Sequence, residues 1–169
     1  MLGQLQGAGN TTTLAHYLGV LSGAGMLAGL QKFHQARVRQ RGFSPKLLVL
    51  NTALMTATSG RSFEAASRDR DFWGRLVESA VGAHLVNGLA GTRDEVLYWR
   101  DRGREVDYVV RGGDQSSCVI EVTSGRRKES LPRLDAFDKA FRPRRKLLVG
   151  GQGMPVDEFL LASPEIWLR

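Results

Sequence analysis

The chain has 169 residues, of which 42% are hydrophobic, and a formal net charge of +7. This size and composition suit one compact domain, or one domain with a small annex, and exclude a wholly disordered chain. No apolar run approaches the ~20 residues that a bilayer span requires, so we expect no membrane contact. The single cysteine, Cys118, excludes an internal disulfide and fits the cytoplasm, where we expect the protein to reside.

The positive charge is concentrated near the N-terminus. Six basic residues and no acidic residue precede Glu64, whereas the rest of the chain has 18 basic and 17 acidic residues. A one-sided block of this kind attracts phosphates or an acidic protein surface, and the alternative is a solvated face. We therefore expect DNA or RNA as a partner, bound by Lys32, Arg37, Arg39, Arg41 and Lys46.

Residues 1–60 predict a small basic annex. Asn10 or Thr11 can cap a helix that ends near Gly23, because their side-chain oxygens accept the first free N–H groups. A strand, a basic ribbon, a turn and a second strand are expected to follow at residues 26–30, 31–41, 42–45 and 46–50. A helix followed by a basic ribbon is typical of part of a winged helix, and a helical annex packed on its neighbour is the alternative.

Residues 61–169 predict an α/β domain. Residues 52–70, which are rich in Thr, Ala, Ser and Gly, are expected to be a linker that leads into it. Apolar periodicity and alternation then predict a helix, three hairpin strands, a helix and a strand, at residues 71–86, 96–100, 105–110, 118–123, 131–141 and 146–150. The last strand should run parallel to the third, because a helix connects them. No phosphate-binding G-x-x-x-x-G-K-[ST] occurs, so no nucleotide site is expected.

Three acidic residues fall where they can form one site. Asp107 and Glu121 lie on successive predicted strands, and Glu78 lies on the preceding helix. Strict alternation puts Asp107 on the face of Val109 and Glu121 on the face of Val119, so the carboxylates can converge. Such oxygen ligands suit Mg²⁺ or Mn²⁺, which polarises phosphate and activates water, with Asp107 and Glu121 as ligands and Glu78 completing the site. Simple ion pairs are the alternative: Asp107 with Arg102 or Arg104, and Glu78 with Arg75.

These residues resemble a known pattern. The order Glu78, Asp107, Glu121-Val122-Thr123 is similar to the PD-(D/E)xK nuclease superfamily, which has a restriction-endonuclease-like fold. Most of the chain also resembles the domain of unknown function that follows the ATPase module in a prokaryotic family of AAA-type ATPases, through residues 10–18, 44–47, 74–78, 98–100, 105–109 and 120–122. The resemblance implies a nuclease-like sheet over residues 71–150 and an ATPase part upstream as a partner. It implies no established activity.

The chain departs from the superfamily pattern at Thr123. The pattern has a lysine there, which positions water and offsets charge on the phosphate, and losing such a charge costs on the order of 10²–10³ in rate. Lys128, after Arg126 and Arg127, can replace it, although such a run is typical of a solvated strand end. We therefore predict a nuclease-like nucleic-acid-binding module with a weak or inactive site. The alternatives are an active Mg²⁺-dependent nuclease with a migrated lysine and a module that docks the ATPase part.

Overall fold

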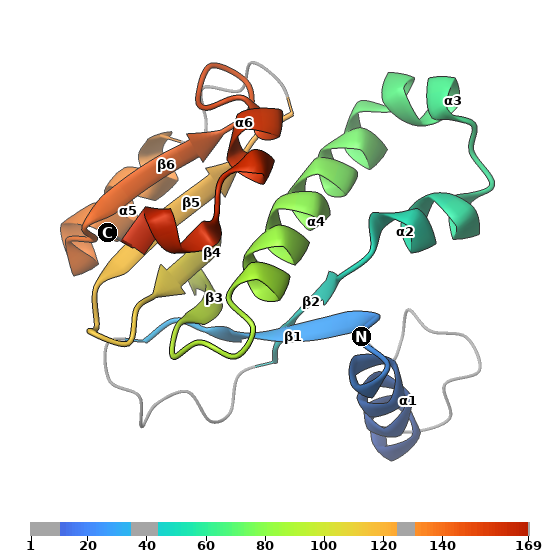
Figure 1. Ribbon diagram of the computed structural model, residues 1–169, viewed down its shortest axis with the longest axis horizontal. Coiled ribbons are helices and arrows are strands. Elements are labelled where there is room, and N and C mark those ends of the chain that lie inside the picture. The colour runs from blue at the N-terminus through green and yellow to red at the C-terminus, as the bar shows by residue number, and fades with distance from the viewer. Residues whose placement is uncertain (1–10, 35–43, 125–130, 169) are drawn as a thin grey trace.

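The computed structural model describes residues 11–34, 44–124 and 131–168. Within them lies a mixed six-stranded sheet in the order β2-β1-β3-β4-β5-β6 (Figure 1). The strands are β1 (Leu27–Lys32), β2 (Lys46–Val49), β3 (Glu95–Asp101), β4 (Arg104–Arg111), β5 (Ser117–Val122) and β6 (Arg145–Val149). The helices are α1 (Thr11–Gly23), α2 (Thr52–Ser59), α3 (Phe63–Arg68), α4 (Arg70–Gly88), α5 (Leu131–Phe141), α6 (Val156–Leu161) and the 3-10 helix η4 (Pro164–Leu168). The α/β class predicted from the sequence is confirmed.

The sheet is built around an antiparallel meander of β3, β4 and β5. β6 pairs parallel to β5, as the helical crossover through α5 predicts. β1 pairs parallel to β3, and β2 pairs antiparallel to β1. The two strands that the sequence assigned to an annex therefore lie in the same sheet as the rest, and the domain division at residue 60 stays a prediction.

Hydrophobic clusters cover both faces of the sheet. On one face, Tyr108 and Ile120 pack with Val81 and Leu85 of α4 and with Phe159 and Trp167 of the C-terminal helices. On the other face, the buried residues come from β3, β4, β5, α5 and the position just after β1: Phe33, Leu97, Trp99, Val106, Val109, Val119, Leu134 and Phe137. Figure 1 shows α4 and α6 on one side of the sheet and α1 standing apart from it. Along the described chain, each helix is too short or too polar to cross a membrane.

Residues 52–70 are not a linker, which corrects the sequence prediction. They form α2, α3 and the start of α4. Asn51 caps α2 by accepting the N–H of Ala53, and Ser62 caps α3 by accepting the N–H of Ala65. These capping bonds satisfy N–H groups that a helix start leaves free, and Ala66 of α3 is buried against α4. The segment rich in Thr, Ala and Ser therefore forms short helices with capped N-termini.

A β-bulge breaks the strict alternation predicted for β4. Leu97 of β3 is opposite Val109, whereas Trp99 is opposite Val106, so Asp107 and Tyr108 together face a single residue of β3. As a result Val106 packs on the face of Val109, while Tyr108 packs on the α4 face. The extra residue puts Asp107 on the face of the sheet opposite to the one predicted. Strict alternation along one strand does not reveal where a residue is inserted relative to its partner strand.

Candidate functional site

The acidic residues of β4 and α4 surround the side chain of Lys46, the first residue of β2. Its Nζ lies 2.8 Å from Glu78 Oε1, 3.2 Å from Glu105 Oε1 and 3.6 Å from Asp107 Oδ1. Arg100 contacts the other oxygen of Glu105 at 3.0 Å. Three carboxylates and two cations thus form one cluster, which we call the Lys46 cluster (Glu78, Glu105, Asp107, Lys46 and Arg100).

The main chain fixes the cluster at the end of the sheet. Asp107 Oδ2 accepts a hydrogen bond from the N–H of Val122 at 2.9 Å, across the gap where β4 and β5 separate. Tyr108 Oη donates to the carbonyl of Glu78 at 2.8 Å, which ties α4 to β4. The Lys46 ammonium also lies 5.5 Å from the centre of the Tyr108 ring. The β-bulge places Asp107 and Tyr108 together for these contacts.

Glu121 takes its partner from the opposite side of the sheet. Its Oε1 accepts a hydrogen bond at 3.2 Å from Arg133 of α5, while its Oε2 is buried without a hydrogen-bond partner among the described residues. The Glu121 side chain is 4% exposed, whereas that of Arg133 is 43% exposed. Asp107 and Glu121 are therefore close in space but are each held by a different cation.

The pKa values reflect burial and crowded negative charge. Burial and the charge of Asp107 raise the pKa of Glu121 to about 8, against the pull of Arg133. Burial and the charge of Glu78 raise the pKa of Asp107 to about 6, against the pull of Lys46. Burial alone would lower the pKa of Lys46, but Glu78, Asp107 and Glu105 outweigh it and raise this pKa to about 12. The cluster thus strongly favours the charged form of Lys46, whereas Asp107 shares this one ammonium with two competing carboxylates.

This arrangement suits an ammonium and does not fit a bare divalent cation. Mg²⁺ requires oxygen ligands at 2.0–2.1 Å in near-octahedral geometry. The carboxylates instead lie at hydrogen-bond distance from Nζ, and Glu121 is turned to Arg133. In residues 11–34, 44–124 and 131–168, no group of three or more His, Cys, Asp or Glu side chains is placed to hold a metal ion. The assignment of Asp107 and Glu121 as metal ligands stays a prediction.

The other predicted site residues are distributed as follows. Thr123 lies just beyond β5, and its backbone N–H donates to the carbonyl of Val149 at 2.9 Å. Lys128 and three of the proposed nucleic-acid contacts, Arg37, Arg39 and Arg41, lie outside the described residues. Lys32 is half-buried in β1, and Lys46 is committed to carboxylates. Sequence reasoning had assigned Lys46 to the nucleic-acid surface, and it had missed Glu105 and Arg133.

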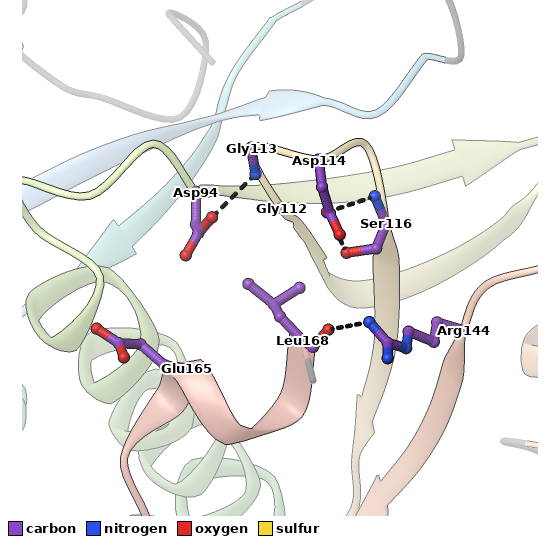
Figure 2. A pocket seen from close by; sticks show the side chains of 8 residues that line it. All are labelled: Asp94, Gly112, Gly113, Asp114, Ser116, Arg144, Glu165 and Leu168. Carbon is purple, nitrogen blue, oxygen red and sulfur yellow. Dashed lines mark hydrogen bonds between the residues drawn. The ribbon is translucent and has the colours of Figure 1, made fainter.

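A separate polar pocket of about 340 Å³ lies at the other end of β4, next to η4 (Figure 2). Its polar groups largely satisfy one another. Asp94 accepts the N–H of Gly113 at 3.0 Å, Asp114 accepts the N–H of Ser116 at 2.9 Å, and Arg144 donates to the carbonyl of Leu168 at 3.1 Å. None of the predicted site residues lines this pocket.

Comparison with known proteins gives a family. No curated protein matches the chain. A solved structure of McrB AAA+ hexamers with bound McrC from Thermococcus gammatolerans is 14% identical over 88% of this chain and 58% of that chain, with a TM-score of 0.37. This chain thus spans less than two thirds of that one, and a TM-score this low supports no inference about fold or function. The model of the family described as "Domain of unknown function (DUF4143)" matches residues 73–159, from the first turn of α4 into α6. Because the match spans half of the chain, the protein belongs to the DUF4143 family.

Proposed function

We propose that this chain is a nuclease-like, nucleic-acid-binding module of an AAA-type ATPase with a weak or inactive cleavage site. The order α4, β3, β4, β5, α5, β6 agrees with the helix, meander, helix and strand expected of a restriction-endonuclease-like core. The excess of basic residues supports a nucleic-acid partner, because phosphate contacts depend on such charge. α1 followed by the β1–β2 hairpin would then be what remains of the winged-helix-like annex.

One observation carries the proposal of a degenerate site. The carboxylates that would hold a metal in a nuclease instead hold Lys46, a cation that the chain itself supplies. The second strand acid, Glu121, likewise contacts a cation of the chain, Arg133, through one carboxylate oxygen at 3.2 Å. Cations of the chain itself, rather than an added ion, thus contact Glu78, Glu105, Asp107 and one oxygen of Glu121. Thr123, in place of the superfamily lysine, agrees with a loss of cleavage.

Binding and cleavage can be measured on the same labelled DNA and RNA. We expect affinity to fall as salt rises, because each phosphate contact releases counterions. With Mg²⁺ or Mn²⁺ added, we expect any cleavage by the native chain to be no faster than cleavage by Asp107→Ala or Glu121→Ala. Absence of binding at low salt, or an affinity independent of salt, would contradict the proposal.

A second candidate is a metal-dependent nuclease in which Lys46 replaces the lysine absent at Thr123. It is favoured by the 3.6 Å distance from Lys46 Nζ to Asp107 Oδ1, which brings an ammonium beside the strand acid. This function requires the carboxylates to rearrange around a metal. It predicts metal-dependent cleavage that Lys46→Gln, Asp107→Ala and Glu121→Ala each abolish. Equal activity of native chain and variants would exclude it.

A further inference from the structure

A cationic hairpin tip adjoins the Lys46 cluster. β3 and β4 are joined by the two-residue turn Arg102–Gly103, in which φ is +45° and +78°. Positive φ at both central positions is the geometry of a tight hairpin turn that favours Asn or Gly at the first position. Arginine occupies that position here, between Arg100 and Arg104, so the tip carries three arginines within five residues, beside one exposed acid, Asp101. We call these three residues the hairpin tip (Arg100, Arg102 and Arg104).

Two of the three arginines of the hairpin tip carry charge that no ion pair of the described residues uses. Arg102 and Arg104 are exposed, and among the described residues neither has an acidic partner. The Arg100 side chain is 67% exposed and contacts Glu105 through Nε. Lys46, by contrast, is 21% exposed and engaged by three carboxylates. Of the basic residues in the hairpin tip and the Lys46 cluster, Arg102 and Arg104 are therefore the ones left for an anion.

The chain of contacts also places the hairpin tip next to the proposed nuclease-like centre. Glu105 is shared between Arg100 and Lys46, and Lys46 in turn contacts Asp107. A two-stranded ribbon is narrow enough to enter the major groove of a duplex. Guanidinium groups match the geometry of phosphate oxygens and bind them through two parallel hydrogen bonds. The turn geometry, the arginine side chains and the position beside the Lys46 cluster thus all favour a ligand that carries phosphate groups.

We propose that the hairpin tip is the surface that grips the phosphodiester backbone of a nucleic acid. This inference rests on the proposed function and names where the nucleic acid is held. It shifts the contact from the N-terminal basic residues to a turn at the end of the meander. Lys46 then acts as an internal counter-ion and makes no phosphate contact.

The test compares two double variants that each remove two exposed arginines. Arg102→Ala/Arg104→Ala changes the hairpin tip. Arg93→Ala/Arg142→Ala is the matched control at the opposite end of the sheet, and Arg142, like Arg102, has a positive φ, of +50°. Fluorescence anisotropy of a labelled duplex DNA and a labelled single-stranded RNA, measured across salt, gives affinity and salt slope for the native chain and both variants.

We expect the hairpin-tip variant to bind about tenfold or more weakly at low salt, and to lose about two units from the slope of log affinity against log salt. The control should stay within about threefold of the native chain. Arg102→Lys/Arg104→Lys should recover most of the salt slope, because it restores the charge. Equal losses in the two alanine variants would show a general charge effect and overturn the inference, as would an unchanged hairpin-tip variant.

Other outcomes separate this inference from the proposed function. If the native chain binds nucleic acid and the hairpin-tip variant binds equally well, the proposed function stands and only this inference fails. If the native chain binds neither DNA nor RNA at low salt, both fail. Displacement of bound nucleic acid by poly-glutamate at an equal concentration of negative charge would identify the hairpin tip as a site for acidic protein, and would also overturn the inference. Thermal melting of each variant confirms that it is folded.

Discussion

At the residue scale, Lys46 has the largest number of charged contacts among the residues of the candidate site. Replacing it by methionine leaves three carboxylates without their shared cation, and unpaired charge at partly buried positions is costly. We expect Lys46→Met to lower the free energy of unfolding by about 2–3 kcal/mol at neutral pH, measured by urea denaturation.

Lys146→Met is the control for Lys46→Met. Lys146 makes one exposed ion pair with Asp138, and such pairs contribute about 0–1 kcal/mol. A loss of the same size in both variants would show that the Lys46 cluster has no special role in stability.

Glu121 gives the protein a pH-dependent stability. Its pKa in the fold is about 8, above its ordinary value of 4.5, so the folded chain binds more protons than the unfolded chain between these values. Stability should therefore fall as pH rises from about 4.5 to 8. In Glu121→Gln this contribution is absent, because an amide does not titrate.

Urea denaturation at several pH values tests this expectation. Near pH 5 the Glu121→Gln variant should match the native chain, and at pH 9 it should be the more stable of the two. Asp107, with a pKa of about 6, also lowers the stability as pH rises, but it does so below about pH 6 and in both proteins. A difference between the two proteins that is constant from pH 5 to 9 would contradict the titration of Glu121.

At the element scale, the position of α4 on the sheet depends on a close approach at Gly82. A Cβ atom there would lie 2.4 Å from Tyr108 Oη, which donates to the carbonyl of Glu78. Gly82→Ala therefore has to push α4 away from β4, and overpacking of this kind costs about 1–3 kcal/mol. We expect a lower urea midpoint, together with a lower pKa of Lys46 as the cluster loosens.

Gly19 of α1 is the matched helical control for Gly82. A Cβ atom there meets nothing within 4 Å, so Gly19→Ala should be neutral or stabilise the chain by up to about 1 kcal/mol through helix propensity. If Gly82→Ala behaves in the same way, α4 is not held by this contact.

The elements also show what the sequence could and could not predict. α4, α5 and the meander were predictable, because each has a local apolar period that decides its structure. α2 and α3 were not predicted, because the Thr, Ala, Ser and Gly content of residues 52–70 favours a linker, whereas these short helices depend on the capping residues Asn51 and Ser62. The β-bulge at Asp107 has no local signal, since it exists only in the pairing with β3.

The candidate site shows the same limit. That Glu78, Asp107 and Glu121 gather near one end of the sheet follows from their positions on adjacent elements. The cation that holds them does not, because Lys46 is distant in sequence from Glu78, Glu105 and Asp107 and reaches them only when β2 joins the sheet. Long-range ion pairs form only when the tertiary structure brings distant residues together, so they leave no local motif in the sequence.

At the scale of the whole molecule, the central issue is whether the N-terminal third is an annex or part of the fold. β1 and β2 add Leu30 and Leu48 to the core, and β2 brings Lys46 to the acids. α1 differs, because none of residues 12–23 is buried. α1 therefore adds no buried residue between positions 12 and 23, whereas β1 and β2 belong to the central sheet, and the division at residue 60 stays a prediction.

Two truncated chains test this boundary. A chain that begins at Met26 lacks α1 but keeps both strands, and it should unfold at nearly the same urea concentration as the full chain. A chain of residues 51–169 lacks β1 and β2, which exposes the edge of β3 and leaves the three carboxylates without Lys46. We expect it to be unfolded or to melt far below the full chain, as seen by circular dichroism. A stable, cooperative fold for residues 51–169 would instead make the N-terminal strands an annex, and would mean that the acidic cluster can form without its internal cation.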